Sequence, residues 1–151
     1  SRIIKPIMKK YFTKSDDVIS VKDATYTVID AYWIAIKKLY PQMFAPKTKS
    51  QFNILLPTSA EIMMKVLSAF LNDQFQKENT EDLTNPETYK KFLVNLRNVK
   101  DVNKSNNKVA GQDIFRVGPD GAIGKYSSAE GKMQMARQIY LTLFPNKEII
   151  F

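Results

Sequence analysis

The side chains that most often carry catalysis or bind metals are scarce in this chain. Its 151 residues include no histidine and no cysteine, so the commonest general base, thiolate nucleophiles and the usual zinc ligands are excluded. Two pairs of adjacent acids, Asp16 with Asp17 and Glu81 with Asp82, fall in polar connections. A metal or glycosidase site instead needs carboxylates that converge from separated positions. We therefore expect a protein that is not an enzyme, with no catalytic residue, no metal site and no cofactor.

A glycine-containing segment is the next candidate for chemistry. Gly118-Pro119-Asp120-Gly121 matches the spacing of neither a phosphate-binding P-loop nor a dinucleotide fingerprint. Proline presets the first torsion of a turn, and Gly121 tolerates a positive φ, so the segment predicts a small β hairpin or tight turn over residues 114–123. Lys125 and Lys132 follow near the start of the last predicted helix, where an anion could bind.

The remaining chemistry is that of a basic surface. Lys and Arg number 23 against 15 Asp and Glu, which gives a net charge of +8, and residues 1–50 alone carry ten basic and four acidic residues. If the first two helices pack side by side, these lysines form one positive surface that attracts phosphates without reading base sequence. The expected phosphate contacts are Lys9, Lys10, Lys14, Lys37, Lys38, Lys47 and Lys49. The alternative is a solvated face whose lysines only keep the protein in solution.

Hydrophobic spacing predicts the elements that position these residues. The pattern indicates a mainly α fold, a single domain over residues 1–151 with about five helices and one short β element. The expected helices cover residues 2–12, 21–40, 58 to 72 or 76, 86–99 and 127–144. Trp33 lies on a broad apolar face, where it is expected to be a core or interface anchor. Four methionines at helical spacing are expected to fill the core: Met63, Met64, Met133 and Met135.

Local signals mark where these helices begin and what connects them. Capping boxes are predicted at Ser20 with Asp23, Thr58 with Glu61 and Ser127 with Glu130. Asn85 before Pro86 predicts an N-cap followed by proline at the first helical position. Residues 42–57 are expected to be irregular, with a short extended piece at Phe52 and 54–56, and residues 101–112 to be the least structured.

Several segments resemble parts of a known family. The segment 31–44, AYWIAIKKLYPQMF, is similar to an aromatic and Ala-Ile-Lys segment in the C-terminal part of DGQHR-domain proteins, a group that includes the DndB-type proteins of bacterial DNA phosphorothioation. The segments 54–59 and 62–67, and the glycine-containing approach at 124–131, are similar to later parts of that region. The resemblance implies a helical region attached to a ParB-like N-terminal module in a DNA-modification or defence context. The signature Asp-Gly-Gln-His-Arg motif is absent, because the chain has no histidine, so no functional residue of the family is carried over.

These observations leave two hypotheses. The first is a non-enzymatic helical accessory domain of a bacterial DNA-associated protein, expected to be a cytoplasmic fragment of a longer chain, which contacts the DNA or RNA backbone and no membrane. The alternative is an interaction or structural domain, which packs on an N-terminal module or on a second copy. Its interface would use the aromatic residues of the second helix: Tyr26, Tyr32, Trp33 and Tyr40.

Overall fold

The computed structural model describes residues 2–11, 18–78, 81–101 and 109–146. These residues form five α-helices: α1 (Ile4–Tyr11), α2 (Val18–Leu39), α3 (Pro57–Gln76), α4 (Pro86–Leu93) and α5 (Ala129–Leu143). Six short 3-10 helices connect them: η1 (Pro41–Met43), η2 (Lys49–Gln51), η3 (Val94–Asn98), η4 (Gly111–Phe115), η5 (Gly118–Asp120) and η6 (Ile123–Tyr126). The predicted mainly α fold is confirmed, and each predicted helix overlaps an observed one.

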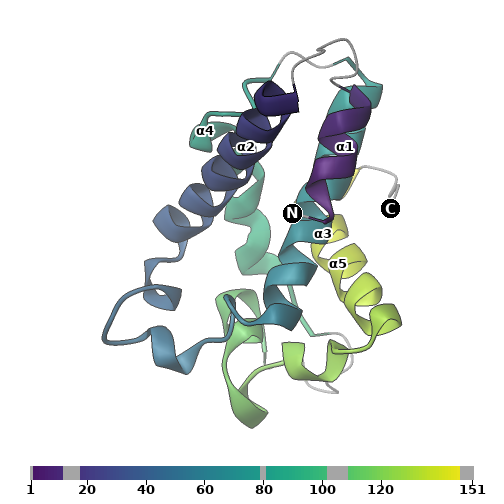
Figure 1. The fold of residues 1–151 in the computed structure, drawn as a ribbon. Coiled ribbons are helices and arrows are strands. Elements are labelled where there is room, and N and C mark those ends of the chain that lie inside the picture. Colours follow the sequence, from purple (N-terminus) through teal and green to yellow (C-terminus); the bar gives the residue numbers. More distant parts are fainter. Residues whose placement is uncertain (1, 12–17, 79–80, 102–108, 147–151) are drawn as a thin grey trace.

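The helices pack in pairs around one core (Figure 1). The short α1 runs antiparallel to the start of α2 and also contacts α3, while α2 packs on α4 and α3 packs on α5. The 3-10 helices η1, η2, η4, η5 and η6 gather at the end of the molecule where α2 finishes and α3 begins (Figure 1). The described part of the chain therefore forms a single helical domain with these five 3-10 helices at one end.

Tyrosines fill the centre of this core and use their hydroxyl groups there. Tyr32, Tyr89 and Tyr140 are 0–1% exposed. The hydroxyl of Tyr32 donates a hydrogen bond to the Met63 carbonyl oxygen at 2.7 Å. A buried phenol needs such a partner, because an unpaired hydroxyl in an apolar interior loses its bond to water without replacement.

The buried tyrosines predict a loss of stability in alkali. Burial, and secondarily the negative charge of Asp73, raise the pKa of Tyr140 to about 12. The folded protein therefore keeps this proton between about pH 10 and 12 while the unfolded chain releases it, so the free energy of unfolding should fall as the pH rises through that range. Tyr140→Phe should make this fall less steep, measured as denaturant unfolding at several alkaline pH values. An unchanged pH dependence in the variant would contradict the assignment.

The N-cap residue is well defined at the starts of α4 and α5. At α4, the Asn85 side chain accepts a hydrogen bond from the Glu87 backbone N–H at 3.0 Å, as predicted. At α5, Ser128 rather than Ser127 is the N-cap, and its hydroxyl accepts from the Gly131 N–H at 2.9 Å. Adjacent serines both fit a capping pattern, and here the η6 turn that precedes α5 includes Ser127 as its C-cap.

The other two predicted capping boxes are wrong. Helix α2 begins at Val18, so Ser20 lies inside it. Helix α3 begins at Pro57 with Leu56 as N-cap and no side-chain cap bond. Proline needs no hydrogen-bond partner for its nitrogen, which makes it suitable for the first turn without a side-chain acceptor. Glu61, the expected partner of Thr58, forms an ion pair with Lys132 instead.

Of the hairpin or tight turn predicted over residues 114–123, the tight turn is present and the hairpin is not: the Gly121 N–H donates to the Gly118 carbonyl oxygen at 3.3 Å within η5, and no paired strands flank this turn. The segment winds through parts of η4, η5 and η6, and the Ala122 N–H bonds to the Ile114 carbonyl oxygen at 3.0 Å. Its extended residue, Arg116, pairs instead with Phe52 in an isolated antiparallel bridge. The short extended piece expected at Phe52 thus has a partner that is distant in sequence.

Gly121 is required in this segment for space rather than for an unusual torsion. Its φ is −107°, whereas the positive φ belongs to Gly118. A Cβ on Gly121 would lie 1.8 Å from the Arg116 carbonyl oxygen. We expect Gly121→Ala to lower the free energy of unfolding by about 2–3 kcal/mol, because the backbone must shift to relieve the overlap. Gly124→Ala is the matched control, since a Cβ there meets nothing within 4 Å; equal losses in urea unfolding would refute the account.

Candidate nucleic-acid interface

Four of the predicted phosphate contacts lie at the C-terminal end of α2. Lys37 and Lys38 occupy its last turn, and Lys47 and Lys49 lie in the segment that follows; all four side chains are exposed. The sequence carries no acidic residue between Asp30 and Glu61. Within the described ranges, the ion pairs are made by other basic residues. Among the residues that the structure describes, no carboxylate forms an ion pair with these four ammonium groups.

The backbone that carries the later two lysines is held by local hydrogen bonds. Pro41 ends α2 and begins η1. The Thr48 hydroxyl donates to the Gln42 carbonyl oxygen at 2.6 Å. The Lys49 N–H donates to the Ala45 carbonyl oxygen at 2.8 Å. These bonds fold residues 41–51 back on themselves, so Lys47 and Lys49 stay close to the end of α2.

Arg97 extends the same surface and was not predicted. A shallow pocket that Arg97, Gly111 and Gln112 share with residues 39–42 joins η3 to the end of α2. The Tyr40 hydroxyl donates to the Leu93 carbonyl oxygen at 2.6 Å. Burial raises the pKa of the Tyr40 phenol, and the nearby Arg97 partly offsets that rise. We call the group formed by Lys37, Lys38, Lys47, Lys49 and Arg97 the α2-end patch.

An apolar groove lies directly beside these cations. Its lining residues are Ile34, Lys37, Lys38, Pro41, Phe44 and Ala45. Ile34 is 43% exposed, although it is a large apolar residue. The two lysines thus share this groove with four apolar residues.

The structure divides the predicted lysines between two places. Lys9 is exposed on α1, where it lines a shallow depression with Arg2, Lys5 and Pro6. Because α1 is antiparallel to the first part of α2 (Figure 1), Lys9 lies near the opposite end of α2 from Lys37, about 25 Å away at 1.5 Å per helical residue. Lys10 belongs to α1, but its side chain and all of Lys14 lie outside the described residues. Side-by-side packing of the first two helices therefore does not gather Lys9 with the α2-end patch.

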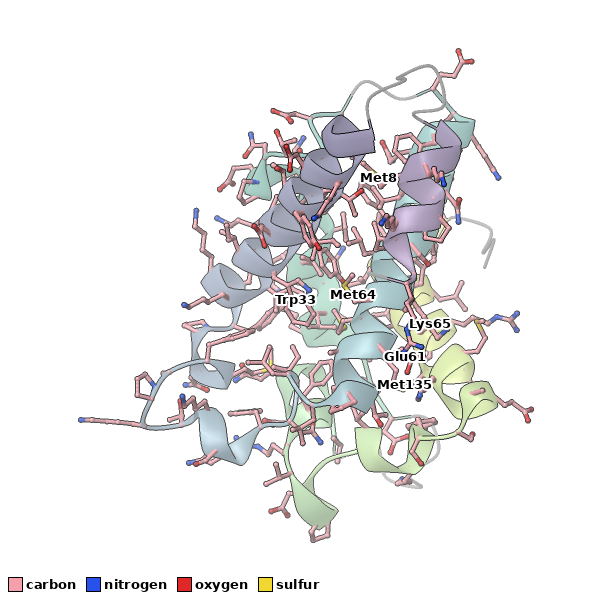
Figure 2. All side chains as sticks on the ribbon, in the orientation of Figure 1. Met8, Trp33, Glu61, Met64, Lys65 and Met135 are labelled. Carbon is pink, nitrogen blue, oxygen red and sulfur yellow. The ribbon has the colours of Figure 1, made fainter. Side chains whose placement is uncertain are left out.

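Lys125 and Lys132, the lysines considered for anion binding near α5, are both paired with carboxylates. Lys132 Nζ lies 2.5 Å from Glu61 Oε2, and the bond from Lys132, with the charges of Lys65 and Arg2, holds the pKa of Glu61 below its usual value. Figure 2 shows Glu61 and Lys65 on α3 near α5. Lys125 Nζ lies 3.0 Å from Asp101 Oδ2. This pairing opposes the predicted anion site.

In the ion pair between Lys125 and Asp101, only the aspartate is buried. The Asp101 side chain is 0% exposed, whereas that of Lys125 is 49% exposed. The Tyr126 hydroxyl donates to the other carboxylate oxygen at 2.9 Å. These bonds tie Asp101, three residues beyond the end of η3, to η6, and they supply hydrogen-bond partners for a buried carboxylate.

The aromatic residues of α2 serve mainly the fold. Tyr32 is completely buried, and Trp33 is half-buried with its indole Nε1 3.4 Å from Met64 Sδ. Figure 2 shows Trp33 and Met64 facing each other between α2 and α3. Tyr26 is 51% exposed. Trp33 thus meets the prediction of an anchor at the margin of the core. Of the four methionines predicted to fill the core, Met63 and Met135 are buried in it, Met64 packs against it, and Met133 is half-buried outside it.

Membrane-spanning helices, metal-binding clusters and similarity to known proteins each bear on what kind of protein this is. Over the described ranges, no helix combines the length and the apolar character needed to cross a bilayer, and no three acidic side chains converge to hold a metal ion. The sequence matches no protein-family model, and no curated protein or solved structure is significantly similar to it. The DGQHR resemblance therefore stays a prediction.

Proposed function

We propose that this chain is a non-enzymatic helical domain that binds nucleic-acid phosphates through the α2-end patch. One observation carries the proposal: exposed cations, uncompensated by acids in the described residues, gather where α2 ends. Cations that bind phosphates release the counterions condensed on the nucleic acid, which drives association without any base contact. The accessory role in a bacterial DNA-associated protein, which the DGQHR resemblance implies, belongs to the same proposal. Lys9, Lys10 and Lys14 stay predicted phosphate contacts that it does not require.

The salt dependence of binding tests the proposal. A fluorescein-labelled DNA duplex should bind at low ionic strength, with an affinity that falls as salt is added. For five phosphate contacts, the logarithm of the binding constant should fall with a slope of about −4 to −5 against the logarithm of salt concentration. Undetectable binding at low salt, or an affinity that does not respond to salt, would eliminate the proposal.

A protein partner is the second candidate function. The observation that favours it is Leu55 and Leu56, which are 63% and 56% exposed beside the start of α3. Adjacent exposed leucines are typical of contacts with a second protein or a second copy. Light scattering of the purified chain tests whether the partner is a second copy, because a strict monomer at high concentration argues against self-association.

A further inference from the structure

We infer that the preferred ligand of the α2-end patch is single-stranded nucleic acid, with one unpaired base held in the apolar groove beside Lys37 and Lys38. This inference rests on the proposed function, because it assumes that the patch binds phosphates. The groove adds a feature that phosphate binding alone does not require, namely an apolar surface of Ile34, Pro41 and Phe44 beside Lys37 and Lys38.

The composition of the groove fits a nucleobase. A base has two apolar faces, and stacking against an aromatic side chain is the common means by which proteins hold unpaired bases. Phe44 is half-buried and lines the groove. Pro41 and Ala45 add apolar surface without a charged atom that would need to lose its water.

The cations near the groove suit the phosphates of the nucleotides on either side of the bound base. Lys37 and Lys38 line the groove. Lys47 and Lys49 follow Ala45, another lining residue, by two and four positions in the sequence. Arg97 lines a second pocket, which shares Pro41 with the groove. Several cations grouped near one apolar groove match a chain that carries one phosphate per nucleotide, and they favour it over a short acidic peptide with one apolar side chain.

The same geometry disfavours a duplex. In a duplex, the faces of each base are covered by its neighbours, so a base can enter the groove only after it is unstacked and unpaired. A single strand presents its bases without that cost. The groove therefore predicts a preference that charge alone cannot produce, because a duplex has the higher charge density.

The test compares three labelled ligands of equal length by fluorescence anisotropy. They are an oligothymidylate, a DNA duplex and an abasic strand, which carries the phosphates without bases. We expect the oligothymidylate to bind about five- to a hundredfold more tightly than the abasic strand, the range expected for one stacked base, and more tightly than the duplex.

Substitutions in the groove test whether it causes the preference for the oligothymidylate over the abasic strand. Phe44→Leu keeps an apolar side chain but removes the ring, and Ala45→Leu fills the groove while every cation remains; each should bring the oligothymidylate close to the abasic strand. Tyr26→Leu is the matched control, since Tyr26 is an exposed aromatic residue of α2 that does not line the groove, and it should keep the preference. Thermal unfolding of each variant shows that it is folded.

The outcomes separate the inference from the proposal on which it rests. If all three ligands bind with similar affinity and similar salt dependence, and Phe44→Leu changes nothing, phosphate binding stands and the base-holding groove is refuted. If none of them binds at low salt, the proposed function fails as well. If a labelled peptide of alternating glutamate and phenylalanine binds in place of the oligonucleotides, the groove belongs to a protein ligand and both are overturned.

Discussion

Replacing Lys37, Lys38 and Lys49 together by glutamine is expected to weaken binding to a DNA duplex at least about 100-fold at low salt. Each lost phosphate contact should also make the salt slope less steep by about one unit. The three side chains are exposed and lie outside the ion pairs of the described residues, so the substitution removes charge without disturbing packing. Anisotropy titrations at several salt concentrations measure both effects, and thermal unfolding should be unchanged.

A second triple variant controls for net charge. Lys77, Lys90 and Lys91 are also exposed or half-exposed, but they pair with Asp73, Glu87 and Glu81. Replacing these three by glutamine removes the same total charge from surfaces where acids already compensate it. We expect a loss of affinity below about threefold, because compensated cations release few counterions. Equal losses in the two variants would show that the α2-end patch has no special part in binding.

Asp101→Ala is expected to lower the free energy of unfolding by about 2–4 kcal/mol. The substitution removes two hydrogen bonds to a charged group and leaves the buried Tyr126 hydroxyl without its 2.9 Å acceptor. It also loosens the tie between the η3 segment and η6. Urea unfolding measures the change.

The control for Asp101 is an ion pair of similar length that is exposed to water. Asp113 Oδ1 lies 2.8 Å from Arg116 Nε, but both side chains are partly exposed. Solvent screens such a pair, so Asp113→Asn should cost less than about 1 kcal/mol. If Asp101→Ala proves as mild as Asp113→Asn, the buried carboxylate does not stabilise the fold in the way described.

The sequence predicted the helices well because each has an apolar face that repeats every three to four residues. Boundaries were less predictable, since several residues near each start satisfy the same rule. Ser127 and Ser128 both fit the residue preference at an N-cap. Because Ser127 is the C-cap of the preceding η6 turn, Ser128 becomes the N-cap of α5. The hairpin failed for a related reason, because the pairing partner of Arg116 is Phe52, which no local pattern reveals.

Some residues of the candidate site were likewise predicted from the sequence, and others were missed. Lys37, Lys38, Lys47 and Lys49 were predicted from the excess of basic residues in the first fifty positions, and these four are also close together in sequence. Arg97 was missed, because its place beside Tyr40 depends on how η3 packs against the end of α2. Asp101 was missed too. An isolated acid in a polar stretch resembles a solvated residue, and its partners Lys125 and Tyr126 follow more than twenty positions later.

The hydrogen bonds that close the segment between η1 and η2 affect the entropy of association. Thr48 and Lys49 are anchored to Gln42 and Ala45 before any ligand arrives, so binding need only restrict the ends of the lysine side chains. A flexible loop would also lose backbone freedom, at roughly 1–2 kcal/mol for each residue fixed. Removing the Thr48 hydroxyl should therefore weaken the proposed binding of a polyanion, even if Thr48 itself does not contact the ligand.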